Sequence, residues 1–161
     1  MRGDTKGNKG KRGGLPYETV VMLAEAAKKS AGNSYSPYSG FIVGAALLTA
    51  DEKVYTGCNV ENAAFSTTVC AERTALVKAV SEGERGFSAI AVYGRMKDGP
   101  ETARPVYPCG VCLQSLIEFC DPEGFIVISS GTNGNYEVNS LIELLPKGFG
   151  PESLKQGPSC T

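Results

Sequence analysis

Residues 69–93, VCAERTALVKAVSEGERGFSAIAVY, place a helical pattern directly before a strand pattern. Apolar residues recur at three- and four-residue spacing over residues 69–82, which predicts a helix that ends at Gly83. Residues 87–93 are apolar and β-prone, so they predict a strand. A helix followed by a strand is the repeating unit of α/β proteins, and this stretch therefore decides the fold class.

The same alternation continues on both sides of this stretch. An apolar, β-prone run at residues 54–60 comes before it, and a second helical pattern at residues 109–120 comes after it. Residues 125–130 then predict a buried strand. Because strands that alternate with helices pair in parallel, we expect parallel pairing in the middle of a mixed sheet.

The two ends of the chain add further elements to this sheet. Residues 15–31 predict a helix, and residues 41–49 predict a strand that a tight turn connects to the antiparallel strand at residues 54–60. Residues 136–138 predict a short strand and residues 141–145 a helical turn. We therefore predict one three-layer α/β/α domain with a mixed five-stranded sheet.

Length and charge limit the class of protein. A chain of 161 residues suits a single domain with a substantial core. No apolar run approaches the ~20 residues of a membrane span, and the N-terminus does not resemble a signal peptide, so we expect no membrane partner and a cytoplasmic location.

The charge of the chain is distributed unevenly. Residues 1–14 carry a net charge of +4, which leaves −5 for the rest of a chain whose total is −1. An acidic body disfavours a nucleic-acid partner. We interpret residues 1–14 as a disordered basic tail, residues 15–155 as the folded domain and residues 156–161 as a frayed tail.

Six cysteines and the absence of histidine restrict the chemistry that a site can use. In a chain without a secretory signal, cysteines favour free thiols or metal ligands over disulfides. Cys109 and Cys112 are three residues apart at the start of one predicted helix, and Cys70 stands at the start of another. Both helices follow strands of the same sheet, so the three thiols are expected to meet at its edge.

Three thiolates and a nearby carboxylate match a catalytic zinc site, in which three protein ligands leave the fourth position to water. Glu72 is the candidate for moving that water's protons. It can share a pocket with Cys70 only if Cys70 occupies the first, non-ideal position of the helix, because a spacing of two does not share a helix face. Three thiolates and one zinc ion sum to −1, and we predict that Arg73 offsets this charge by hydrogen bonding to the ligands.

Two other interpretations of the cysteines stay open at this point. A structural zinc site would use a fourth protein ligand, for which Cys58 and Cys120 are available. A redox pair at Cys109 and Cys112 is the second, although the pair follows a long loop late in the chain.

Several motifs in their order along the chain resemble the cytidine deaminase family. Cys70-Ala71-Glu72 together with residues 108–112 (PCGVC) is similar to the zinc deaminase signature. The other motifs are SPYSGF at residues 36–41, VGAA at 43–46, GCNVENAA at 57–64 and ELLP at 143–146. The resemblance covers residues 17–154.

This resemblance implies an activity and a set of residues. The activity is the zinc-dependent hydrolysis of cytidine and 2′-deoxycytidine to the uracil nucleosides and ammonia in pyrimidine salvage, by a homotetramer with one zinc ion per chain. The implied zinc ligands are Cys70, Cys109 and Cys112, and Glu72 is the implied proton shuttle. The implied substrate contacts are Phe41, Asn59, Glu61, the backbone near Ala63 and Ala71, and Phe149 from a neighbouring subunit.

Two positions depart from the family pattern, and three rival functions remain. Phe65 stands where many relatives have tyrosine, and Leu113 stands where arginine is common. The rivals are a deaminase of a nucleoside antibiotic, a deaminase of cytosine within RNA, and a non-catalytic interaction module that zinc stabilises. Glu72 separates the enzymes from the module, because a structural zinc site has no use for it.

Overall fold

The computed structural model describes residues 14–99, 104–132 and 134–154. The predictions for residues 1–13 and 156–161 lie outside these residues. The helices are α1 (Tyr17–Ala31), α2 (Ala71–Ser81), α3 (Gly110–Ile117) and α4 (Leu141–Leu144), with short 3-10 helices η1 (Phe65–Thr67) and η2 (Pro151–Leu154). The strands are β1 (Phe41–Thr49), β2 (Val54–Cys58), β3 (Phe87–Met96), β4 (Ile126–Ser130) and β5 (Tyr136–Ser140).

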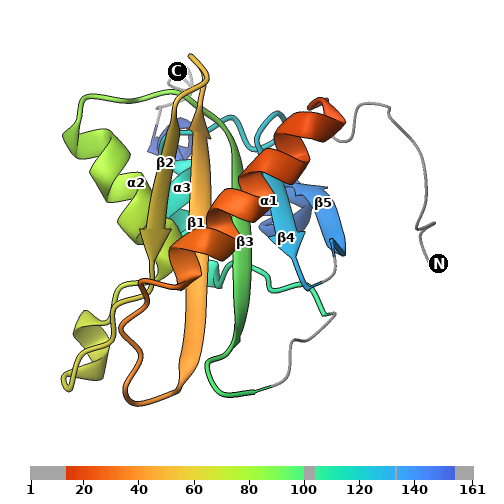
Figure 1. The fold of residues 1–161 in the computed structure, drawn as a ribbon. Coiled ribbons are helices and arrows are strands. Elements are labelled where there is room, and N and C mark those ends of the chain that lie inside the picture. The colour runs from red at the N-terminus through yellow and green to blue at the C-terminus, as the bar shows by residue number, and fades with distance from the viewer. Residues whose placement is uncertain (1–13, 100–103, 133, 155–161) are drawn as a thin grey trace, which may run out of the picture.

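The five strands form one mixed sheet in the order β2-β1-β3-β4-β5 (Figure 1). β3 and β4 pair in parallel, and the other neighbours pair antiparallel. The predicted parallel pairing in the middle of a mixed sheet is therefore confirmed. Since β2 and β3 both run opposite to β1, their carboxyl ends reach the same edge, and the chain enters α2 and α3 from that edge.

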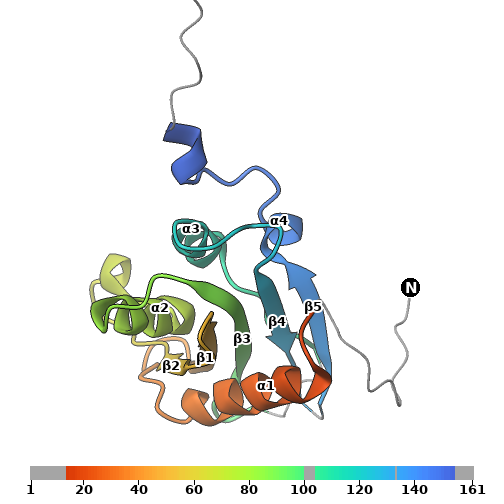
Figure 2. The ribbon, with the colours of Figure 1, turned by 90° about the horizontal axis from the view of Figure 1, so that it is seen from above.

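Helices cover both faces of the sheet, which confirms the three-layer prediction. α1 lies alone across one face, whereas α2, α3 and α4 lie on the other side (Figure 2). Alternate residues of β1 face the two cores: Ala45 and Leu47 pack toward α2 and α3, and Ala46 and Leu48 pack toward α1. Within the described residues, no helix is both long and apolar enough to cross a bilayer.

Two glycines set how closely the helices approach the sheet. A Cβ atom on Gly57 of β2 would collide with the Ala71 carbonyl oxygen and lie 2.5 Å from the Ala75 nitrogen. A Cβ atom on Gly44 of β1 would collide in the same way with the backbone of α1 at Ala27. The first turn of α2 therefore rests directly on β2, and this contact determines where Cys70 stands.

The boundaries differ from the predicted ones where long-range pairing intervenes. β2 ends at Cys58 rather than at residue 60, because Val60 leaves β1 and bridges to Tyr35 and Val69. β3 continues past Tyr93 to Met96, because it stays paired with β1 as far as Phe41. The helical pattern at residues 69–82 forms a helix only from residue 71, with Cys70 as its extended N-cap.

Candidate active site

The three predicted thiols lie together at the N-termini of α2 and α3. Cys70 is the N-cap of α2 and Cys109 is the N-cap of α3, and both have extended backbone, with ψ of 155° and 163°. Cys112 follows in the first turn of α3 and is fully buried. The Sγ atom of Cys109 lies 3.9 Å from that of Cys70 and 3.5 Å from that of Cys112, and all three sulfurs lie within 4.8 Å of one another.

These distances fit a zinc ion held by three thiolates. Tetrahedral coordination with Zn–S bonds of about 2.3 Å places two sulfurs about 3.8 Å apart. Among the described residues, no fourth thiol or carboxylate joins this group, and Cys58 and Cys120 lie outside it. The donor set is therefore that of a site with an open coordination position, whereas a structural site uses four protein ligands.

The proximity of the thiols changes their acidity. The hydrogen bond with Cys112 lowers the pKa of Cys70 to about 6, with smaller contributions from Cys109 and from the charge of Arg73, against the opposing effect of burial. The same interaction with Cys70, together with burial and the charge of Glu72, raises the pKa of Cys112. Cys70 is thus more acidic than Cys112, and it lies at a helix N-terminus, where the dipole favours an anion.

Glu72 reaches the thiols because Cys70 is not a helical residue. Cys70 is the extended N-cap of α2, as the spacing of residues 70 and 72 required, and the Glu72 carboxyl group hydrogen-bonds to Cys112 and lies close enough to Cys70 to interact with its charge. Glu72 is only 4% exposed. Burial raises the pKa of its carboxyl group, and the negative charge of Cys70 adds to this effect, while a hydrogen bond from its own backbone opposes it.

Arg73 lies on the same turn as Glu72. One of its terminal nitrogens donates to the carbonyl oxygen of Thr68 over 2.8 Å, which turns the guanidinium back toward the start of α2. Its Nε atom is buried and has no hydrogen-bond partner among the described residues. Arg73 therefore supplies a positive charge and an unused donor close to Cys70.

A short bridge brings the polar residues after β2 to the thiols. The backbone groups of Val60 and Val69 exchange hydrogen bonds of 2.9 and 3.0 Å, so the loop between them closes on itself. Asn59 and Glu61 flank the first residue of this bridge and Cys70 follows the second. Residues that are about ten positions apart in sequence therefore lie next to each other.

These two polar side chains hold the start of β1 and the loop that precedes it. Asn59 is 8% exposed, its Oδ1 atom accepts the Val43 N–H over 2.8 Å, and its Nδ2 atom donates to the Phe41 carbonyl over 2.9 Å. The Oε2 atom of Glu61 accepts the backbone N–H groups of Tyr38 at 2.9 Å and Ser39 at 3.2 Å. The Ser39 hydroxyl and these two amides lower the pKa of Glu61.

The remaining predicted contacts fall in different surroundings. Phe41 is half-buried at the start of β1, and its ring packs on Gly94 of β3. Ala71 is buried in the first turn of α2, whereas Ala63 is exposed on the loop beyond Glu61. Phe149 is 58% exposed on the C-terminal segment, and its carbonyl accepts a hydrogen bond from Gln114.

Sequence reasoning missed two residues that hold Asn59 and Glu61 and one that holds the segment of Phe149. Ser34 donates its hydroxyl to Asn59, Ser39 contacts Glu61, and Gln114 donates to the Phe149 carbonyl over 2.6 Å. Serine in a polar loop gives no signal of its partner, because the partners lie more than twenty positions away. The two residues that depart from the family pattern lie in different surroundings. Phe65 is exposed and its ring meets that of Tyr38 edge to face, whereas Leu113 is buried in the core beside α2.

Comparison with known proteins identifies the family. Residues 18–128 match the family model described as "Cytidine and deoxycytidylate deaminase zinc-binding region". The chain belongs to this family. The match spans the thiol cluster, Glu72 and the strands that carry them, so the predicted resemblance and the predicted zinc cofactor are confirmed.

Individual relatives of this deaminase align over most of its length. It is 44% identical to "Cytidine deaminase" of Sporosarcina psychrophila over 84% of this chain and 94% of the relative. It is 43% identical to "Probable cytidine deaminase" of Dictyostelium discoideum over 87% of this chain and 90% of the relative. The crystal structure of cytidine deaminase from Burkholderia pseudomallei superposes with a TM-score of 0.72 at 47% identity, over 80% of this chain and 97% of that one.

Proposed function

We propose that this deaminase hydrolyses cytidine and 2′-deoxycytidine to the corresponding uracil nucleosides and ammonia, as a step of pyrimidine salvage. The observation that carries the proposal is the buried carboxyl group of Glu72 beside three convergent thiols. A structural zinc site has no need of such a group, whereas hydrolysis at a ring carbon needs a group that accepts and returns protons.

Cys70, Cys109 and Cys112 would hold the zinc ion through their thiolates. The bound ion supplies Lewis-acid activation of water, so that a nucleophile forms near neutral pH. Arg73 and the two helix N-termini offset the negative charge of three thiolates, which would otherwise weaken that activation.

Glu72 moves the protons of the reaction. Its carboxylate accepts a proton from the attacking water, passes one to N3 of the cytosine ring, and later protonates the departing amine. A group that works both as base and as acid needs a pKa nearer to the working pH than that of a solvated glutamate. Burial of Glu72 shifts its pKa in this direction.

The polar residues after β2 are proposed to bind the sugar. Both backbone donors to Glu61 meet Oε2, so we assign Oε1 to a sugar hydroxyl as an acceptor, and we assign a free N–H of Asn59 as the donor. Phe41 forms a wall of the pocket and limits the bulk of the ligand. Backbone groups near Ala63 and Ala71 complete the contacts to sugar and base.

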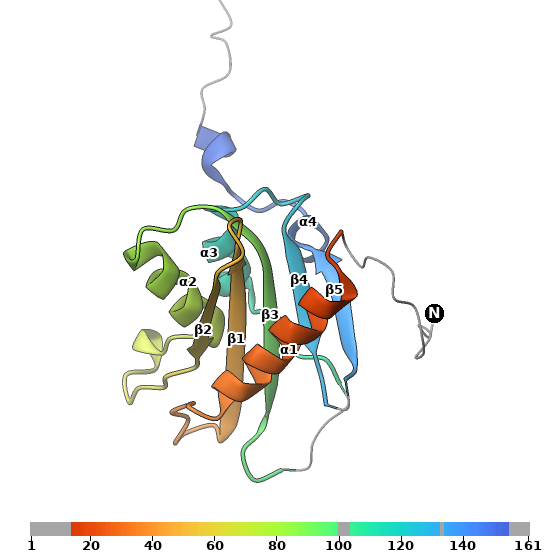
Figure 3. The ribbon, with the colours of Figure 1, turned by 45° about the horizontal axis from the view of Figure 1, so that its top comes forward.

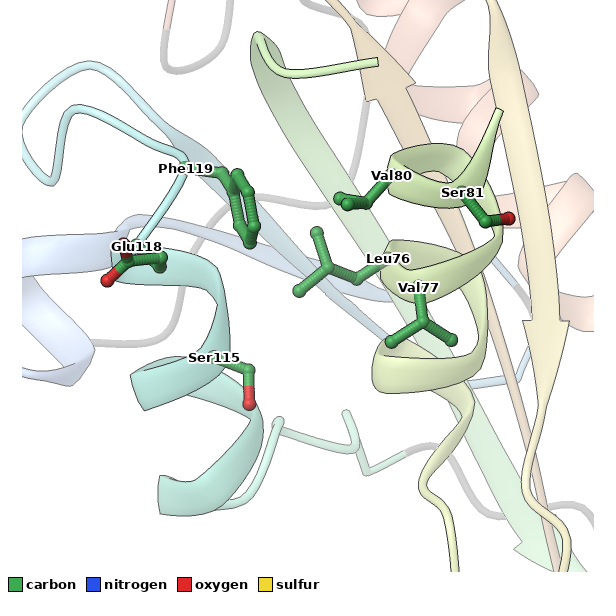
Figure 4. Close-up of a pocket in the computed structure, with 7 residues that line it drawn as sticks. All are labelled: Leu76, Val77, Val80, Ser81, Ser115, Glu118 and Phe119. Atoms are coloured by element: carbon green, nitrogen blue, oxygen red, sulfur yellow. The ribbon is translucent and has the colours of Figure 1, made fainter. Parts of the chain in front are cut away.

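We also propose a cytoplasmic homotetramer, in which Phe149 contacts the base in a neighbouring subunit. The C-terminal segment with η2 stands away from the body of the domain (Figure 2; Figure 3). Between α2 and α3, the side chains of Leu76, Val80 and Phe119 line an apolar groove (Figure 4). Exposed Val77 and the groove favour burial against another copy of the chain. Ligand thiols suit a reducing compartment.

The direct test is turnover of cytidine by protein whose zinc content has been measured. The ultraviolet absorbance of cytosine changes as it becomes uracil, so the reaction is followed continuously. We expect turnover with one zinc ion bound per chain. Zinc at one equivalent without turnover of cytidine or 2′-deoxycytidine would contradict the proposed function and favour a non-catalytic zinc module.

A further inference from the structure

We propose that Ser34 is a positioning residue that makes Asn59 a hydrogen-bond donor, and not an acceptor, toward the nucleoside. The inference rests on the proposed function and adds a residue to it. Ser34 lies in the turn after α1, and its hydroxyl donates to the Oδ1 atom of Asn59 over 2.5 Å. No motif in the sequence connects these two residues, which are 25 positions apart.

The hydrogen bonds of the Asn59 carboxamide leave one group for a ligand. A carboxamide offers two acceptor sites on oxygen and two N–H donors. The Val43 N–H and the Ser34 hydroxyl occupy both acceptor sites, and the Phe41 carbonyl takes one N–H. The second N–H of Nδ2 remains.

The same set of bonds prevents the carboxamide from turning over. In the flipped orientation, the NH₂ group would face the Val43 N–H, and the oxygen would face the Phe41 carbonyl. The Ser34 hydroxyl can donate or accept, so it does not select this orientation, but in the observed one it donates to Oδ1 and occupies the acceptor site that would otherwise accept a hydroxyl proton. The nucleoside hydroxyl at Asn59 must therefore accept, and its own proton is left for Glu61.

The backbone holds Ser34 where this bond can form. Its N–H donates to the Ala31 carbonyl over 3.1 Å at the end of α1, and the next residue, Tyr35, donates to the Asn59 carbonyl over 3.1 Å. The Ser34 hydroxyl thus bonds to the side chain of a residue whose backbone is already held, because the Asn59 carbonyl accepts from Tyr35 and the Asn59 N–H donates to Val43. Removal of the hydroxyl should change the side chain of Asn59 more than the path of the loop.

The test compares Ser34→Ala with wild type on cytidine and on its 2′-deoxy, 3′-deoxy and 5′-deoxy analogues. We expect Ser34→Ala to lower kcat/KM for cytidine about fivefold, mostly through KM, because one hydrogen bond of ordinary strength is lost. We expect this loss to disappear for the one analogue that lacks the hydroxyl bound by Asn59. Ser34→Thr keeps the hydroxyl and should restore most of the activity.

Two controls separate positioning from a general effect on the fold. Ser88→Ala removes another part-buried serine hydroxyl, which bonds to the Thr49 carbonyl at the other end of the sheet, and should leave all four substrates unchanged. In an Asn59→Ala background, Ser34→Ala should cause no further loss if Ser34 acts through Asn59.

An equal loss on all four nucleosides, wild-type kinetics in Ser34→Ala, or full additivity with Asn59→Ala would overturn the proposal. If the wild-type protein turns over no nucleoside, the proposed function has failed. The same series is then measured as equilibrium binding of the four nucleosides, and absence of the pattern there overturns the role of Ser34.

Discussion

The two sides of the pocket are built in different ways. On the metal side, the three thiols and Glu72 all stand on the first turns of α2 and α3 or on their N-caps. On the sugar side, Asn59 and Glu61 stand in irregular chain and are held by hydrogen bonds to the loop at residues 34–41. In the proposed function, the chemistry is thus carried by residues at the starts of regular helices, and recognition of the sugar is carried by residues of an irregular segment.

This difference predicts how each side fails. Loss of one metal-side group removes a function that nothing else in the pocket can perform. Loss of one sugar-side group removes a hydrogen bond and loosens a loop, and the metal remains. Substitutions should therefore separate into those that abolish turnover or zinc binding and those that weaken nucleoside binding with zinc retained.

Cys109→Ala should have the largest effect, because it removes the zinc ligand whose sulfur lies next to both of the other thiols. We expect loss of bound zinc and of detectable turnover, measured by metal analysis and by the ultraviolet assay. Cys120→Ala, which removes a thiol outside the cluster, serves as the control and should keep one zinc ion per chain. Zinc retained at one equivalent in Cys109→Ala would reject its role as a ligand.

Glu72→Gln should lower kcat by about 10³-fold while zinc stays bound, because general acid–base catalysis contributes about 10²–10⁴-fold. The amide is nearly isosteric but cannot exchange the proton. Glu82→Gln, at the exposed far end of α2, is the matched control and should behave as wild type. Near wild-type turnover in Glu72→Gln would exclude it as the proton shuttle.

Asn59→Ala should act on the sugar side alone. It removes the proposed donor to the nucleoside and three bonds that hold Ser34 and the start of β1, so we expect kcat/KM to fall on the order of 100-fold, chiefly through KM. Zinc content should stay at one equivalent. A loss of zinc equal to that in Cys109→Ala would show that the two sides are not independent.

Gly57→Ala should reach the metal side through packing. The added methyl group overlaps the backbone of α2 at Ala71 and Ala75, and we expect the free energy of unfolding to fall by about 2 kcal/mol or more. Gly86→Ala, where the new Cβ would meet only the Ala50 side chain at 3.5 Å, is the control. Thermal unfolding of both variants measures the difference, and equal midpoints would contradict the tight contact.

Glu61 should give the smallest effect, visible as a dependence of stability on pH. The Ser39 hydroxyl and two backbone amides lower its pKa below the ordinary value of 4.5, so its ionised form stabilises the fold above that pH. This contribution is lost as pH falls through the lowered pKa. The melting temperature of wild type should therefore exceed that of Glu61→Gln at pH 7, and the gap should close below pH 4.5. A gap that is constant with pH would contradict this origin.

Much of the metal side could be predicted, because its residues stand at helix starts whose common location follows from the order of strands and helices. Helix periodicity and the positions of Cys70 and Cys109 at helix starts already suggested convergence, and the alternation of strands and helices placed both starts at one edge. Whether Cys70 and Glu72 lie close together, despite their spacing of two residues, could not be decided in this way. It depends on an N-cap with extended backbone, which is known only when the helix boundary is known to one residue.

On the proposed sugar side, the sequence pattern alone showed Asn59 and Glu61 only as polar residues after a strand. The family resemblance named Asn59 and Glu61, but their partners could not be inferred. The bonds to Ser34, Tyr38 and Ser39 span more than twenty positions and depend on how the loop after α1 folds over β2. The roles of Asn59 and Glu61 toward a substrate, like those of Phe41 and Phe149, stay predictions.

The sequence by itself determined the order of the elements, the absence of histidine ligands and the set of three thiols with one carboxylate. These follow from residue identity and short-range periodicity, which each segment carries alone. Only the tertiary structure decided that Val60 pairs with Val69, that α2 rests on Gly57, and that Asn59 offers a donor. Those features arise from contacts between distant segments, whose pairing depends on the packing of the whole sheet and its helices.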